Sequence, residues 1–156
     1  MKRKALEDLR HWKENPERKP LIIRGARQVG KTWLMREFGR QFYQNTVYFN
    51  FDEEMELSEI FLHNKNPQRI IELLGFLCGE KIEQGKTLLI FDEIQECPEA
   101  LNTLKYFQEK ANEYHVIAAG SLLGTLLAQP KSFPVGKVSI LELYPLDFEE
   151  FLTAVS

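Results

Sequence analysis

Residues 25–32 read Gly-Ala-Arg-Gln-Val-Gly-Lys-Thr and match the pattern Gly-x-x-x-x-Gly-Lys-Ser/Thr at every fixed position. Glycines let such a loop curl so that successive backbone N–H groups point at a phosphate. The lysine adds a positive charge, and the threonine hydroxyl can ligate Mg²⁺. We therefore predict that this loop binds nucleotide phosphates. The predicted binding residues are Gly25, Ala26, Arg27, Gln28, Val29, Gly30, Lys31 and Thr32.

A second group with chemical potential is the acidic pair Asp92-Glu93, which ends the apolar run Leu-Leu-Ile-Phe at residues 88–91. Beside a phosphate loop, Asp92 would hold Mg²⁺, through a water, and Glu93 would activate the attacking water as a general base. Adjacent strand residues point to opposite sides, so the two carboxylates can take different roles. Acidic residues also end strands simply because they are well solvated. The pair therefore indicates hydrolysis only in combination with the loop.

Four further polar residues are weaker candidates. Ser121 follows the apolar run at residues 116–119 and could orient the attacking water or sense the γ-phosphate; a helix N-cap is the alternative. Arg24 flanks the loop, and Arg27 within it could contact the nucleotide, project to a partner or simply lie on the surface. Lys137 is a candidate cation for a neighbouring active site. The three histidines are scattered, so we expect no metal cluster.

The positions of apolar residues predict the elements that hold these groups. Helical spacing favours helices over residues 3–14, 32–42, 55–62, 67–83 and 98–111. Short apolar runs favour strands over residues 21–23, 46–51, 88–91, 116–119 and 138–143. Uniformly apolar strands that alternate with helices are typical of a parallel sheet covered on both faces, which is the α/β class.

Composition narrows the class of protein. With 156 residues, 44% of them hydrophobic and 28% charged, the chain fits one globular domain. It has no apolar run of membrane-spanning length and no signal core after its basic start, so a cytoplasmic location is expected. Cys78 and Cys97 are far apart and are expected to be reduced thiols.

Charge is unevenly distributed along the chain. Residues 1–40 carry 12 Lys and Arg against 5 Asp and Glu, although the formal net charge of the whole chain is -3. A basic segment of this kind attracts phosphates, of either a nucleotide or a nucleic acid. The simpler explanation, which we favour, is a solvated helix face together with a single phosphate site.

The end of the sequence contains one more helical pattern. Asp147 and Glu150 are spaced as in a capping box, and apolar residues continue at helical spacing to Val155. An amphipathic helix that ends at Ser156 suggests a domain, residues 1–156, that was cut from a longer protein. The alternative is a natural terminal helix that docks on the core.

Taken together, these motifs resemble AAA-type ATPases of the AAA_14 domain family. The resemblance rests on residues 20–32, on Phe-Asp-Glu-Ile-Gln at residues 91–95, on Gly120-Ser121, and on the block from Leu143 to Leu152. It implies a P-loop NTPase three-layer sandwich with a mainly parallel five-stranded sheet, in which the Ser121 strand lies between the loop strand and the Asp92 strand. It also implies a following C-terminal DUF4143 domain. The family usually has Gly-Arg where this chain has Gly136-Lys137, so Lys137 lacks the planar fork of an arginine finger.

These observations predict an ATP-binding domain that hydrolyses Mg-ATP to ADP and phosphate, slowly in isolation, as the motor or switch part of a longer protein. The predicted catalytic residues are Lys31, Glu93 and Ser121, and the predicted metal ligands are Thr32 and Asp92. ATP is preferred to GTP on the resemblance and because no guanine-reading Asn-Lys-x-Asp motif occurs. A homo-oligomer or the missing domain is the expected partner, and no membrane is expected. The alternatives are a non-catalytic nucleotide switch, a nucleic-acid remodelling module and, less compatible with Glu93, a small-molecule kinase.

Overall fold

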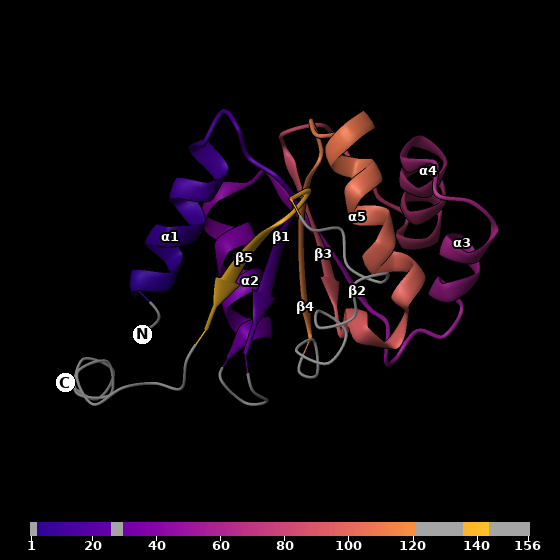
Figure 1. The fold of residues 1–156 in the computed structure, drawn as a ribbon, viewed down its shortest axis with the longest axis horizontal. Helices are drawn as coiled ribbons and strands as arrows, with labels where there is room; N and C mark the ends of the chain where they lie inside the picture. Colours follow the sequence, from indigo (N-terminus) through magenta and orange to yellow (C-terminus); the bar gives the residue numbers. More distant parts are fainter. Residues whose placement is uncertain (1–2, 26–29, 121–135, 144–156) are drawn as a thin grey trace.

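The computed structural model describes residues 3–25, 30–120 and 136–143, which form a five-stranded sheet between two layers of helices (Figure 1). All strands are parallel, in the order β2-β3-β4-β1-β5. The strands are β1 (Leu21–Arg24), β2 (Asn45–Asn50), β3 (Thr87–Asp92), β4 (His115–Gly120) and β5 (Ser139–Glu142). The predicted α/β sandwich is therefore confirmed, and so is the place of β4 between β1 and β3.

Helices cover both faces of the sheet. The first layer contains α1 (Arg3–Glu14) and α2 (Lys31–Phe42), and the second contains α3 (Leu57–His63), α4 (Pro67–Cys78) and α5 (Pro98–Lys110) (Figure 1). A short 3₁₀ turn, η1 (Ile94–Glu96), joins β3 to α5. Two hydrophobic clusters, one on each side of the sheet, form the core.

Alternation along the buried strands assigns side chains to these two clusters. In β3, Leu89 and Phe91 belong to the cluster under α3, α4 and α5, whereas Leu88 and Ile90 belong to the cluster under α1 and α2. Continuing this alternation places Asp92 on the α2 side of the sheet. The direction of the buried carboxylate is thus fixed by the apolar residues before it.

The element boundaries differ from the expected ones at a few places. The expected helix 67–83 ends at Cys78, because Gly79 adopts a left-handed conformation with φ 70° and its N–H bonds the carbonyl of Gly75. The expected helix 55–62 begins two residues later, at Leu57. The expected helix after Asp147 lies outside the described residues.

The sheet gathers the functional segments at one edge. Because the strands are parallel, β1, β3 and β4 end on the same side, at Arg24, Asp92 and Gly120. Ligands of open parallel sheets bind beyond these carboxyl ends. Of the predicted site residues that the structure describes, Gly25, Lys31, Thr32, Asp92 and Glu93 lie at this edge.

Candidate functional site

The phosphate-binding loop joins β1 to α2. Gly25 follows the strand, and Gly30 precedes the helix with φ 87°, a left-handed conformation that glycine adopts without strain. Lys31 is the first residue of α2 and is only 7% exposed, and its Nζ donates a hydrogen bond to the carbonyl oxygen of Gly25 at 2.8 Å. The lysine thereby ties the two ends of the loop together. Ala26, Arg27, Gln28 and Val29 lie outside the described residues.

Asp92 lies beside the first turn of α2. Its side chain is buried, and Oδ2 accepts a hydrogen bond from Thr32 Oγ1 at 2.6 Å. The other carboxylate oxygen, Oδ1, accepts the backbone N–H of Glu93 at 2.9 Å. A hydroxyl and a carboxylate held together in this way are hard oxygen donors, which Mg²⁺ prefers, and the predicted ligand pair is therefore compatible with that ion.

Glu93 is placed by an unusual backbone conformation. Its φ of 54° and ψ of 44° are left-handed, and its Oε2 accepts a hydrogen bond from Gln95 Nε2 at 2.6 Å. The alternation expected for two strand residues does not apply, because β3 ends at Asp92 and the chain turns at Glu93. A strained non-glycine residue held by its surroundings is common at functional sites.

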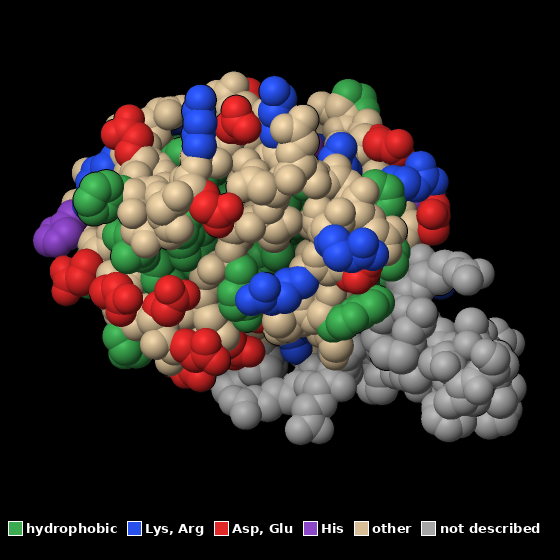
Figure 2. Space-filling model, turned by 180° about the vertical axis from the view of Figure 1, so that it is seen from behind, with side chains coloured by type: hydrophobic (Ala, Val, Ile, Leu, Met, Phe, Trp, Pro, Cys, Tyr) green, Lys and Arg blue, Asp and Glu red, His purple; other side chains and the backbone are tan. Residues whose placement is uncertain are grey.

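A cavity of about 470 Å³ opens between the loop end and these carboxylates. It is lined by Gly30, Lys31, Thr32, Trp33, Asn50, Asp52, Glu53 and Glu93. Asp and Glu side chains also gather on the side of the molecule where α3 lies (Figure 2). The cavity thus combines the buried Lys31 with the acidic residues Asp52, Glu53 and Glu93. A bound cation would reduce the repulsion between these carboxylates and an anionic ligand.

Sequence reasoning missed two residues at this edge. Tyr48 Oη donates to Asp92 Oδ2 at 2.5 Å, and Asn50 lines the cavity. A signal for both was present, since polar residues 46, 48 and 50 alternate with the buried Val47 and Phe49 along β2. Because Val47 and Phe49 face the cluster under α3, α4 and α5, the side chains of residues 46, 48 and 50 face the α2 side of the sheet, where Asp92 lies.

Arg24 and Lys137 are not among the residues that line this cavity. Arg24 forms an ion pair with Glu142 on the neighbouring strand β5. Lys137 precedes β5, whose first residue pairs with the first residue of β1, so Lys137 lies at the opposite edge of the sheet from its own phosphate loop. It contacts Glu109 at 3.5 Å. Ser121 lies outside the described residues.

Comparisons with known proteins identify the family and the fold. The sequence profile of the AAA_14 family, an AAA domain, matches residues 17–152. The chain belongs to the AAA_14 family. No curated protein matches it.

Solved structures show that this AAA_14 chain has the P-loop ATPase fold. A Walker-type ATPase from Pyrococcus abyssi is similar over 99% of this chain and 57% of its own, with a TM-score of 0.65 and 19% identity. A structure of Drosophila ORC bound to DNA covers 97% and 45%, with a TM-score of 0.64 and 19% identity. Aeropyrum pernix Orc1 in complex with DNA covers 91% and 43%, with a TM-score of 0.55 and 16% identity. The AAA_14 chain thus spans about half the length of these proteins.

The described residues lack two features. No helix among them is long and apolar enough to cross a membrane. Within the same residues, no cluster of three or more His, Cys, Asp or Glu side chains could hold a metal ion. Mg²⁺ in nucleotide sites is usually held by one or two protein oxygens together with phosphates, so the Thr32 and Asp92 pair remains suited to it.

Proposed function

We propose that this AAA_14 domain binds ATP with Mg²⁺ and hydrolyses it to ADP and phosphate, as the motor or switch part of a longer protein. One observation carries the proposal: Thr32 Oγ1 lies 2.6 Å from Asp92 Oδ2, beside the buried Lys31 and the cavity that Glu93 lines. A glycine-flanked loop without that carboxylate would bind phosphate only. Thr32 Oγ1 and Asp92 Oδ2 would hold the magnesium ion, and Glu93 would activate the attacking water, which are the two further functions that hydrolysis requires.

Each residue has a role in the proposed reaction. Backbone N–H groups of residues 25–32 and the Lys31 ammonium bind the phosphates. Thr32 and Asp92 would hold Mg²⁺, which when bound neutralises developing phosphate charge. Glu93 accepts a proton from the attacking water, and Gln95 fixes the orientation of its carboxylate. Ser121 remains a proposed water-orienting or γ-phosphate-sensing residue.

The decisive experiment is phosphate release from Mg-ATP by the wild-type chain and by the Glu93→Gln variant. Loss of the general base is expected to lower turnover by about 10²-fold or more while nucleotide binding persists. Glu96→Gln is a matched control, because Glu96 is an exposed acid three residues further along the chain. Equal turnover in the Glu93 variant and the wild type would disprove the proposed role.

A range of protein concentrations separates catalysis by a single chain from catalysis completed by a neighbour. Turnover per molecule that rises with concentration supports a homo-oligomeric site. Tight Mg-ATP binding without turnover at any concentration supports the alternative of a nucleotide switch. Lys31→Ala is the binding control and should weaken affinity by roughly 10²-fold, because it removes a buried charge from the phosphate site.

The nucleic-acid alternative finds less support in the side chains. In the described part of residues 1–40, Arg10, Arg24 and Arg40 all form ion pairs with glutamates. Their charges are therefore partly neutralised within the molecule. A salt-sensitive gel shift with DNA or RNA would nevertheless restore this alternative, whereas no shift at about 50 mM salt would count against it.

A further inference from the structure

Tyr48 makes a contact with the predicted magnesium ligand that the phosphate-loop pattern does not require. Its hydroxyl lies 2.5 Å from Asp92 Oδ2, the oxygen that also accepts the Thr32 hydrogen bond. Asn50 Nδ2 donates a hydrogen bond to the same hydroxyl oxygen at 3.4 Å, so this oxygen acts as an acceptor toward Asn50. The Tyr48 proton is therefore directed at Asp92.

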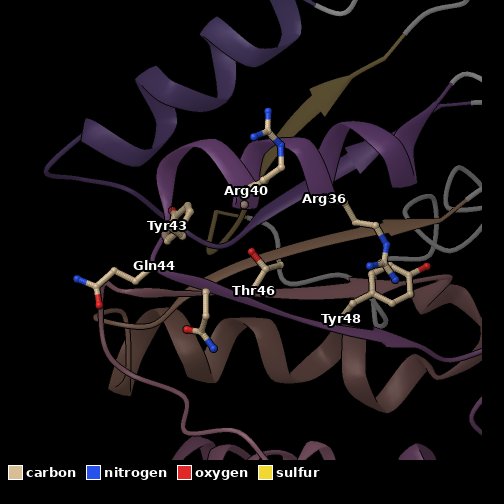
Figure 3. Close-up of a pocket in the computed structure, with 8 residues that line it drawn as sticks. Arg36, Arg40, Tyr43, Gln44, Thr46 and Tyr48 are labelled. Atoms are coloured by element: carbon tan, nitrogen blue, oxygen red, sulfur yellow. The ribbon is translucent and has the colours of Figure 1, made fainter.

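The ring of Tyr48 is held from the other side by Arg36. The guanidinium of Arg36 lies 3.8 Å from the ring centroid, and Figure 3 shows the two side chains stacked in a groove between α2 and β2. The groove has a volume of about 340 Å³ and is also lined by Gly39, Thr46 and Arg40. A cation above an aromatic face is attracted by the ring, although only weakly at an exposed site. Arg36 thus links the surface to the Asp92 carboxylate through a single aromatic ring.

The chemistry of Tyr48 suits a permanent hydrogen-bond donor. A phenolic hydroxyl keeps its proton at physiological pH and can therefore donate to the carboxylate at all times. Asp92 then has two donors on Oδ2 and one on Oδ1. Three donors fix the plane of a carboxylate that could otherwise rotate. Partners that orient a metal ligand in this way commonly affect metal affinity by 10–100-fold.

We propose that Tyr48 is a positioning residue of the magnesium site, with Arg36 holding its ring in place. The hydroxyl keeps Asp92 Oδ2 beside Thr32 Oγ1, so that these two residues would together hold the ion. This inference rests on the proposed function, since it concerns the Mg²⁺ that accompanies the nucleotide. It adds a residue on β2, the strand at the far end of the sheet from β5, to the site formed by β3 and α2.

The test measures the coupling between Mg²⁺ and nucleotide. The affinity of the purified chain for a fluorescent ATP analogue is determined in saturating Mg²⁺ and again in EDTA, and the ratio of the two affinities is the coupling. Tyr48→Phe should lower this ratio about 10-fold or more, while the affinity in EDTA stays unchanged. A purely structural role for the hydroxyl would shift the melting temperature or both affinities together. An unchanged or increased ratio would overturn the proposal, and an increase would mean that the hydroxyl competes with the ion.

Two further variants sharpen the result. Tyr43→Phe is the matched control, because Tyr43 also has a largely buried hydroxyl with one side-chain partner, His115 Nδ1 at 2.6 Å. Its coupling ratio should equal that of the wild type. Arg36→Met, at an exposed position, should lower the ratio about twofold to threefold, in line with the small energy of the stack. A wild-type ratio in this variant would overturn the part assigned to Arg36.

Failure of the inference and failure of the proposed function have different signatures. If wild-type affinity is the same with Mg²⁺ and in EDTA, the proposed magnesium site is wrong, and this inference falls with it. If the wild type shows coupling and Tyr48→Phe retains it, only the role of Tyr48 is wrong.

Discussion

At the scale of single residues, the site combines saturated hydrogen bonding with backbone strain. Asp92 is buried yet has three donors, so its burial leaves neither carboxylate oxygen without a partner. Glu93, the next residue, adopts a left-handed conformation that costs about 1–2 kcal/mol for most side chains. The proposed base therefore has a backbone conformation that lowers the free energy of unfolding.

This strain predicts a difference between two variants of Glu93. Both Glu93→Gln and Glu93→Asn remove the carboxylate, but asparagine tolerates the left-handed region better. We expect the asparagine variant to be more stable than the glutamine variant by roughly 1 kcal/mol, as measured by urea unfolding. Both should lack turnover. Equal stabilities would show that the backbone at Glu93 relaxes once the side chain changes.

His115 makes stability depend on pH. Burial first, and then the nearby cations Arg18 and Lys13, lower its pKa from 6.5 to about 4. Between these values the unfolded chain binds a proton that the folded chain does not. The stability gained from the neutral histidine is therefore fully present above pH 6.5 and declines as the pH falls toward 4.

Melting temperatures at pH 7 and pH 5 test this dependence. The decrease on acidification should be smaller in His115→Asn than in the wild type, because the asparagine cannot take up the proton. His11→Asn is the control, since His11 is exposed and its loss should leave the decrease unchanged. An identical decrease in all three proteins would mean that His115 does not contribute.

At the scale of elements, the position of α2 on β2 depends on one glycine. A Cβ at Gly39 would lie 2.1 Å from Thr46 Oγ1, far inside normal contact distance. The absence of a side chain lets the helix that carries Lys31 and Thr32 lie close to the strand that carries Tyr48. The geometry around Asp92 is therefore set partly by a contact two turns along the helix.

Gly39→Ala should accordingly destabilise the fold despite the better helix propensity of alanine. The overpacking penalty of about 1–3 kcal/mol exceeds or matches the gain of up to about 1 kcal/mol from propensity. Adding Thr46→Ala, which removes the nearest atom, should recover most of the loss in urea unfolding. Additive effects of the two substitutions would contradict direct contact.

The elements were largely predictable because their signals are local. Apolar runs and helical spacing identified the five strands and the five α-helices of the described residues, and the phosphate loop is a contiguous pattern. Tyr48 was not recognised because its role arises only when β2 lies beside β3, a pairing between distant segments. The shortened α4 reflects Gly79, whose left-handed conformation ends the helix before the charged residues that had been included in it.

At the scale of the whole molecule, different charged residues lie at the carboxyl ends of the strands and at their amino ends. The edge where the strands end holds Lys31, Asp92 and Glu93, and the edge where they begin holds Lys137 and its partner Glu109. A cation on the second edge cannot reach the phosphate site of the same chain. Any contribution of Lys137 to catalysis would have to come from a neighbouring copy.

We therefore expect Lys137→Ala to change the Mg-ATP affinity of a dilute chain by less than about twofold, because surface charges outside the site contribute little. Fluorescence titration at low protein concentration measures this affinity, with Lys31→Ala as the variant that loses it. A large loss in Lys137→Ala would show that the lysine acts within its own chain.

The place of β1 in the sheet has a consequence for biosynthesis. Ile22 pairs with Ala118 on one side and with Ile140 on the other, so the strand that precedes the phosphate loop finds its partners only among segments translated much later. Pairings that are distant in sequence form slowly, because the loop between them must close first. When a nascent chain has emerged from the ribosome as far as α4, it contains the complete loop sequence. It does not yet contain β4 or β5, the two strands that pair with β1. The ability to bind a nucleotide should therefore appear late in synthesis, when β4 emerges from the ribosome and pairs with β1.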